Sequence, residues 1–208
     1  MPSCAGGWVR RKGTDTLDPL QSLHDKGTGL NSAAHAEAWK PVADWPAAAR
    51  PAALWSYLAE AGSLTERLRV KAGSAFHVQL LNQGHFALSD EDMALLGAKP
   101  EEAGFVRQVY LCGRAPLVYA RSLAVGAAEH WLKELGEQPL GERVFAEADA
   151  SRGPIQVAEL GPRHALYREA VAGLKPQPQG TLWARRSLLT VSGAGILIYE
   201  CFLPELAG

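Results

Sequence analysis

Residues 195–204 read GILIYECFLP, and this stretch decides how the rest of the chain must fold. Its β-branched and aromatic residues predict a strand that ends at Pro204. Because side chains alternate along a strand, these residues fall on two faces. One face carries Ile196, Ile198, Glu200 and Phe202, and the other carries Leu197, Tyr199, Cys201 and Leu203. Both faces are mainly apolar, so we expect a central strand that is covered on both sides.

Two charged residues in predicted strands need a partner. Glu200 is the one formal charge in the stretch above, and a buried carboxylate must be paired, protonated or in use. Residues 105–111 (FVRQVYL) predict a second strand that contains Arg107, whose guanidinium cannot escape burial by losing its proton. Two interpretations stay open. Arg107 and Glu200 neutralise each other in the core, or they lie on either side of a cavity and meet opposite ends of a polar ligand.

The composition is that of an ordinary globular protein. The chain has 208 residues, which is enough for one domain with a sizeable core. A net charge of -1 and an isoelectric point of about 6.6 argue against a nucleic-acid partner. No apolar run approaches the roughly 20 residues that span a bilayer, and no signal-peptide pattern follows the basic residues 10–12. We therefore expect a cytoplasmic protein without stable membrane insertion.

Cysteines and histidines give no sign of a metal or cofactor. Cys4, Cys112 and Cys201 are too few and too scattered for a disulfide framework or a zinc site. Cys112 and Cys201 lie in or beside predicted strands, which favours small buried side chains in a reducing compartment. The histidines show no metal-binding spacing, and the chain has neither a Gly-rich phosphate loop nor a Gly-x-Ser-x-Gly motif.

The chain divides into an extension and a domain. Residues 1–50 are rich in Gly, Ala, Pro, Ser and Asp without sustained periodicity, which predicts a flexible or poorly ordered extension. Residues 51–208 form the predicted domain. Within it, Ser63 and Glu66 have the spacing of a capping box, which predicts a helix that begins at Leu64.

The domain pattern predicts about six strands, mostly joined by hairpins, with helices between them. They are expected at residues 76–81, 105–111, 117–125, 152–158, 183–191 and 195–204. Since no strand–helix–strand rhythm is present, this favours an α+β domain with a single antiparallel sheet and helices packed on it. Arg121, in the strand after that of Arg107, is a further candidate to meet an anion near Arg107.

Six short motifs, taken in order over roughly residues 52–204, resemble the chorismate lyase family. They are GSLTERL at 62–68, VRQVYL at 106–111, ARS at 120–122, LGEQPLG at 135–141, LWARRS at 182–187 and YECFLP at 199–204. The N-terminal quarter of the chain lies outside this resemblance. The resemblance implies a chorismate-lyase-like antiparallel sheet, a monomer, a site closed by flap segments and no cofactor.

The resemblance also implies an activity and its residues. Such an enzyme removes pyruvate from chorismate to give 4-hydroxybenzoate, the first step of ubiquinone biosynthesis. Arg107 and Glu200 match the family's catalytic arginine and carboxylate, with Arg107 on the ring carboxylate and Glu200 on the ring hydroxyl. Leu64 and Leu140 match positions that contact the bound product, and Arg121 would hold the second carboxylate. Leu64 stands where the family often has methionine, a change that nearly conserves volume.

Two other functions compete with this one. The chain could be a non-catalytic effector-binding domain, because some bacterial transcription regulators contain domains of similar fold. Such a regulator needs a DNA-binding domain, and residues 1–50 lack the two periodic helices and the basic face of a helix-turn-helix. Alternatively, the chain could be a structural paralogue in which Arg107 and Glu200 only fill the core.

Overall fold

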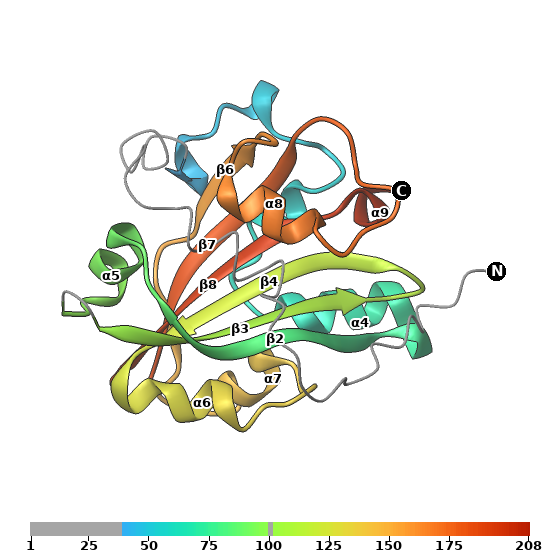
Figure 1. Ribbon diagram of the computed structural model, residues 1–208. Coiled ribbons are helices and arrows are strands. Elements are labelled where there is room, and N and C mark those ends of the chain that lie inside the picture. Colours follow the sequence, from blue (N-terminus) through green and yellow to red (C-terminus); the bar gives the residue numbers. More distant parts are fainter. Residues whose placement is uncertain (1–38, 100–101) are drawn as a thin grey trace, which may run out of the picture.

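One antiparallel sheet organises the computed structural model, which describes residues 39–99 and 102–208 (Figure 1). Its strands are β1 (Lys40–Pro41), β2 (His77–Ala87), β3 (Ala103–Cys112), β4 (Pro116–Ala124), β5 (Ser151–Arg152), β6 (Gln156–Leu160), β7 (Leu182–Val191) and β8 (Ala194–Phe202). They are arranged in the order β1-β6-β7-β8-β4-β3-β2, and β5 pairs with β7. The strand of Glu200, β8, is central, as its two apolar faces predict.

Among the described residues, the sheet has eight strands rather than the predicted six. The strand predicted at residues 152–158 is divided into β5, which ends at Arg152, and β6, which begins at Gln156. The other additional strand, β1, has only two residues, too few for an alternating pattern to identify. The strand predicted at residues 76–81 continues to Ala87, past a register shift between Leu80 and Asn82 that interrupts the alternation. The predicted α+β class with a single antiparallel sheet is confirmed.

Short helices cover both faces of the sheet. They are α3 (Trp55–Leu58), α4 (Leu64–Ala72), α5 (Asp90–Leu96), α6 (Glu129–Lys133), α7 (Leu140–Val144), α8 (Ala165–Val171) and α9 (Pro204–Ala207), with 3-10 turns η1 (Val42–Asp44), η2 (Ala47–Ala49), η3 (Gly73–Ala75) and η4 (Gly126–Ala128). Helix α4 begins at Leu64 as predicted, because Ser63 Oγ accepts a hydrogen bond from the backbone N–H of Glu66 at 3.2 Å. In the described part of the chain, no helix has the length and apolar character needed to cross a membrane.

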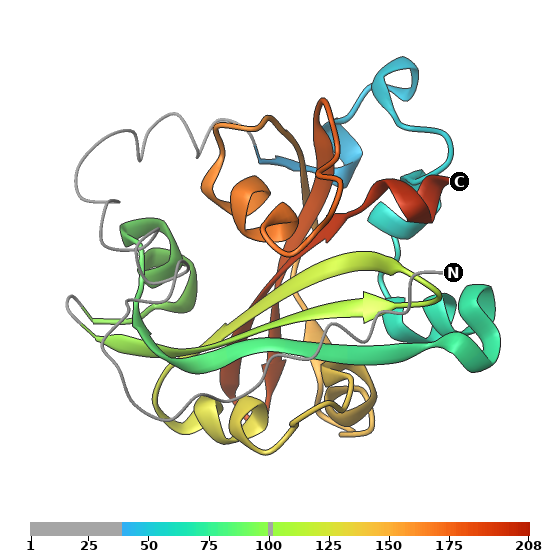
Figure 2. The ribbon, with the colours of Figure 1, turned by 45° about the vertical axis from the view of Figure 1, so that its right-hand side comes forward.

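Apolar side chains form three clusters, one on one face of the sheet and two on the other. Helix α8 lies against the first face, where Leu166 and Tyr167 belong to the same cluster as Tyr199 of β8 (Figure 2). On the opposite face, one cluster gathers around α3 and α4, and a second gathers around α6 and α7. Cys112 and Cys201 are buried in the first cluster, as expected of small core residues.

Residues 39–50 belong to the folded domain, so the predicted boundary at residue 50 lies too late in the chain. Trp39 is buried, and its ring lies edge-on to that of Tyr199 at 5.7 Å. The indole Nε1 of Trp45 donates to the carbonyl of Val157 at 3.2 Å. Pro41 lies in the outermost strand, where a missing N–H costs no ladder hydrogen bond. The rest of the predicted extension, residues 1–38 with Cys4, lies outside the described residues.

The hairpin of β7 and β8 determines which residues face each other in the centre of the sheet. Ser192 and Gly193 have φ values of 50° and 73°, which is the left-handed pair of a two-residue type I′ turn. Val191 therefore pairs with Ala194, and counting outward along both strands brings Arg185 directly opposite Glu200.

Candidate active site

Polar side chains gather on the face of the sheet that carries Arg107, which we call the site face. Residues paired directly across strands share a face, so the register identifies its members. One row across β3, β4, β8 and β7 contains Arg107, Ser122, Ile198 and Ser187, and the next row contains Val109, Ala120, Glu200 and Arg185. Arg107 and Glu200 therefore lie on one face, as the interpretation with a shared polar ligand requires, at the boundary between the two apolar clusters.

Arg107 is a buried cation without an anion. Its side chain is 2% exposed, and Nη2 donates to the carbonyls of Gly136 at 2.9 Å and Gln138 at 2.8 Å. Its Nε is buried without a hydrogen-bond partner, and no carboxylate in the described part of the chain forms an ion pair with it. Burial lowers the pKa of Arg107 to about 10. Carbonyl groups solvate this charge but do not neutralise it.

Glu200 has a different partner from the one that the sequence suggested. Its Oε2 accepts from Arg185 Nε at 2.5 Å, in a pair whose members are both buried. Arg185 is 1% exposed, and its Nη1 also donates to the carbonyls of Tyr57 at 2.9 Å and Glu60 at 2.7 Å. The interpretation in which Arg107 and Glu200 neutralise each other is therefore wrong, because Glu200 is paired through β7.

Small residues lie between Arg107 and Glu200. The two strands that carry them, β3 and β8, are separated by β4, so their backbones are about 10 Å apart across the sheet. On the site face, β4 presents Ala120 and Ser122 in this interval. A cation and a carboxylate thus lie on either side of a strand whose own side chains are short.

Leu64 and Leu140 approach the site face from its two apolar clusters. Leu64 is the first residue of α4 and Leu140 is the first residue of α7, and both are buried. The two helices meet, because Arg69 Nε lies 2.6 Å from Glu142 Oε1. A Cβ on Gly141 would lie 3.3 Å from Thr65 Oγ1, so α7 approaches α4 closely at this point. Four of the five predicted site residues thus lie over one face of the sheet.

Arg121 is the exception, and its predicted place near Arg107 is wrong. It pairs across strands with Gln108 and Tyr199, which puts it on the opposite face. Its Nη2 lies 3.3 Å from Asp92 Oδ2, and its Nε lies 3.9 Å from Glu169 Oε2. Burial acts against the charge, but Glu169 and Asp92 outweigh it and raise the pKa of Arg121 above its ordinary value.

The Arg121 pair predicts a structural role for Asp92, whose Oδ1 also accepts from the hydroxyl of Tyr199 at 2.7 Å. Replacing Asp92 with Asn leaves a buried guanidinium short of one anion, so we expect the free energy of unfolding to fall by about 3 kcal/mol. Urea denaturation measures this loss. The control is Asp90→Asn, an exposed position in the same first turn of α5, where we expect about 0.5 kcal/mol. Equal losses in the two variants would contradict the role.

Sequence reasoning missed two arginines of the site face, Arg185 and Arg152. Arg152 lies in β5 opposite Leu189, and its Nη1 donates to Ser187 Oγ at 2.5 Å. Burial lowers the pKa of Arg152, and the charge of Arg185 adds to this effect while Glu200 opposes it. The turn at residues 192–193 could have revealed Arg185 through its register. Arg152 begins the strand predicted at residues 152–158, but nothing in the sequence indicated that it would pair with β7.

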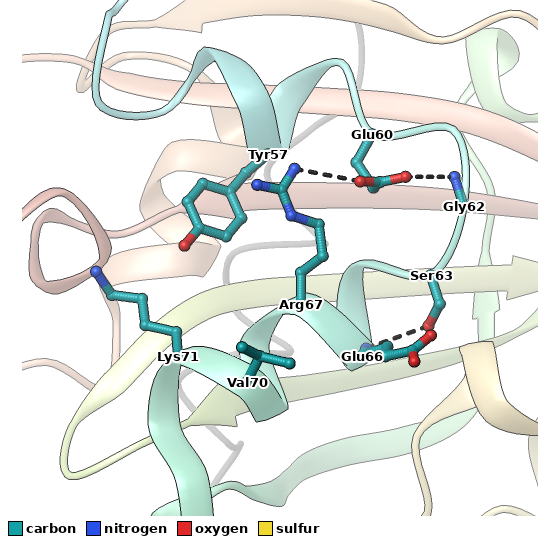
Figure 3. A pocket seen from close by; sticks show the side chains of 8 residues that line it. All are labelled: Tyr57, Glu60, Gly62, Ser63, Glu66, Arg67, Val70 and Lys71. Atoms are coloured by element: carbon teal, nitrogen blue, oxygen red, sulfur yellow. Dashed lines mark hydrogen bonds and ion pairs between the residues drawn. The ribbon is translucent and has the colours of Figure 1, made fainter.

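A surface pocket of about 590 Å³ is formed by α3, α4 and the segment between them (Figure 3). Tyr57 and Glu60, whose carbonyls accept hydrogen bonds from Arg185, are among its lining residues. Its lining residues are Tyr57, Glu60, Gly62, Ser63, Glu66, Arg67, Val70 and Lys71. Arg67 lies between the ring of Tyr57 and the carboxylate of Glu60, to which its Nη1 donates at 3.2 Å. Among residues 39–99 and 102–208, no group of three His, Cys, Asp or Glu side chains could hold a metal ion.

Comparison with known proteins gives the family. The family model of chorismate lyase matches residues 34–207. A probable chorismate pyruvate-lyase of Nitrosospira multiformis is 35% identical over 182 residues, which are 84% of this chain and 97% of the relative. Another, of Halorhodospira halophila, is 40% identical over 176 residues, which are 82% of this chain and 91% of the relative.

Solved structures support the same fold. The effector domain of PhnF from Mycobacterium smegmatis has a TM-score of 0.54 and covers 70% of this chain and 91% of its own. At 11% identity, this likeness concerns the fold alone. The family model and the curated relatives, in contrast, match the sequence over most of its length, and the chain therefore belongs to the chorismate lyase family.

Proposed function

We propose that this protein removes pyruvate from chorismate and releases 4-hydroxybenzoate, as the first step of ubiquinone biosynthesis. The observation that carries the proposal is the buried, unpaired guanidinium of Arg107 on the same face as Glu200. A buried cation without an anion in the described chain is stabilised by a ligand that supplies one. The family to which the chain belongs indicates which ligand this is.

The two charged residues divide the recognition of this ligand. Arg107 binds the ring carboxylate, since a guanidinium suits the two oxygens of a carboxylate. Glu200 accepts a hydrogen bond from the hydroxyl on ring carbon C4 or takes the proton from C4 itself. Leu64 and Leu140, which begin α4 and α7, contact the two sides of the ring.

The reaction needs little beyond position and charge. The C4–H bond and the bond from C3 to the ether oxygen both break, and the ring becomes aromatic. The electron pair of the C3–O bond leaves with the three-carbon group, which takes up a proton and becomes pyruvate. Since aromatisation makes the step favourable, the protein contributes by holding chorismate in one orientation and by stabilising the developing charge.

The alternative function, an effector-binding domain, predicts a different result when the protein is mixed with chorismate. With purified protein and chorismate, a lyase forms 4-hydroxybenzoate and pyruvate in equal amounts, whereas a binding domain forms neither. Chromatography measures the aromatic product and a lactate dehydrogenase assay measures pyruvate. Binding of 4-hydroxybenzoate without any turnover of chorismate would contradict the lyase and favour the effector-binding domain.

A further inference from the structure

We propose that Arg185 and Arg152 bind the second carboxylate of the substrate, the one on the three-carbon group that leaves as pyruvate. This inference rests on the proposed function and extends it to two residues that lie beyond Glu200 as seen from Arg107. The strand order β3-β4-β8-β7 places Arg185 on the far side of Glu200, and β5 adds Arg152 beside β7.

Arg185 has a donor to spare at this position. Three of its hydrogen bonds are accounted for by Glu200 and by the carbonyls of Tyr57 and Glu60. Its Nη2 is buried and has no hydrogen-bond partner among the residues that the structure describes. A buried donor of a charged group is costly to leave unpaired, and a carboxylate oxygen is the acceptor that suits it best.

Arg152 lies on the same face and, like Arg185, has a buried donor that lacks an acceptor in the described part of the chain. Its side chain lies beside Ser187, which is two residues from Arg185 along β7. Its Nε is buried and, like Nη2 of Arg185, has no hydrogen-bond partner within residues 39–99 and 102–208. In the register of the sheet, Arg152 lies opposite Leu189 of β7, on the face that also carries Arg185 and Glu200.

The charges on the site face suit a dianion. Arg107, Arg152 and Arg185 supply three positive charges, and Glu200 supplies one negative charge. Glu60, whose charge opposes the lowering of the Arg152 pKa, is paired with Arg67 at the edge of the surface pocket. The net excess of two positive charges matches chorismate, which carries two carboxylates, better than it matches a product with one.

The order of groups in chorismate agrees with this placement. The ether that leads to the second carboxylate is attached to C3, next to the hydroxyl on C4, while the first carboxylate is on C1. A ring with its first carboxylate at Arg107 and its hydroxyl at Glu200 therefore directs the three-carbon group toward β7 and β5. Negative charge grows on the ether oxygen as the C3–O bond breaks, and the two guanidiniums stabilise it there.

The test uses a ligand that cannot react, so that it does not depend on turnover. The probe 3-(carboxymethoxy)-4-hydroxybenzoate has both carboxylates and the hydroxyl on an aromatic ring, and 4-hydroxybenzoate is the same ring without the carboxymethoxy group that carries the second carboxylate. For Arg152→Gln we expect the Kd of the probe to rise about 10-fold to 100-fold and that of 4-hydroxybenzoate to change less than about twofold. Isothermal titration calorimetry measures both constants.

Arg185→Lys and Arg186→Lys form a matched pair of neighbouring buried arginines on opposite faces of β7. Arg186 pairs with Glu91 and Gln156, away from the site face, so its variant should bind both ligands as the wild type does. Arg185→Lys retains one charge for Glu200 but loses the free Nη2, and it should weaken the probe selectively. Arg152→Gln remains decisive if Arg185→Lys does not fold, because Arg152 donates to a side chain rather than to the main chain.

The outcomes separate this inference from the proposed function. A loss of affinity for the probe but not for 4-hydroxybenzoate in Arg152→Gln supports the inference. Equal Kd values for the probe in wild type and Arg152→Gln would overturn it, even for a protein that turns over chorismate. An equal loss of affinity for the probe and for 4-hydroxybenzoate would also overturn the inference, because that result places Arg152 at the ring rather than at the second carboxylate.

Discussion

Replacing Arg107 with methionine should lower kcat/KM for chorismate about 1,000-fold, which corresponds to about 4 kcal/mol of lost binding to the transition state. Methionine has a similar length but offers no donor to the ring carboxylate. The same variant should bind 4-hydroxybenzoate far more weakly, since that product carries the carboxylate that Arg107 would hold. Steady-state kinetics and calorimetry measure the two effects.

The stability of the ligand-free variant should change far less than its activity. Burial lowers the pKa of Arg107 to about 10, well below its ordinary value. The unfolded chain therefore binds its proton more tightly, and the charged guanidinium destabilises the native state at every pH below about 10. Methionine removes this cost but leaves the carbonyls of Gly136 and Gln138 without their donor, so the two effects oppose each other.

The control for this prediction is Arg143→Met. Arg143 is an exposed residue of α7 that pairs with Glu134, so its loss should leave kcat/KM within about twofold of the wild type. If Arg107→Met retains more than a tenth of the wild-type kcat/KM, Arg107 does not bind the reacting molecule. An unfolded Arg107→Met would instead indicate that its bonds to the main chain dominate.

Replacing Glu200 with glutamine should lower kcat by about 100-fold to 10,000-fold if the carboxylate takes the C4 proton. Glutamine keeps the shape and can still accept a hydrogen bond from the hydroxyl, so the Kd of 4-hydroxybenzoate should rise less than about tenfold. A fall in binding with an unchanged kcat would contradict the role as a base and leave Glu200 as an orienting group.

The same substitution should destabilise the protein. Glu200 is the carboxylate with which Arg185 pairs, and both side chains are buried. Removing one partner of a buried pair costs about 3–5 kcal/mol, because the remaining charge has no compensation. The double variant with Arg185→Met removes both charges and should recover part of this loss without recovering activity. Urea denaturation of both single variants and the double variant measures this coupling.

The sequence predicted the centre of the site because its pattern there was strong. Residues 195–204 are apolar on both faces, and Glu200 stands out among them. The alternation around Arg107 was equally clear, and the structure places both residues on one face. The helix that begins at Leu64 was predictable from the capping residue Ser63.

Arg121 was misplaced because alternation within a strand does not say which of its faces matches which face of a neighbour. The pairing register decides this, and β3 and β4 are joined by a turn with a register shift between Leu111 and Cys112. The turn at residues 192–193, which joins β7 and β8, was recognisable in the sequence. A two-residue turn at this place pairs Glu200 with Arg185. Arg152 begins the strand predicted at residues 152–158, but its pairing with β7, which places it on the site face, is a tertiary contact that no local pattern records.

One consequence of Arg185 concerns motion rather than chemistry. The guanidinium that pairs with Glu200 also fastens the main chain at Tyr57 and Glu60, just before the segment that leads into α4 and Leu64. Lifting that segment off the sheet breaks two hydrogen bonds from a charged donor, each contributing about 1.5–3 kcal/mol. The side chain of Arg185 thus holds both the main chain before α4 and the carboxylate of Glu200, so mutations that weaken one of these contacts will disturb the other.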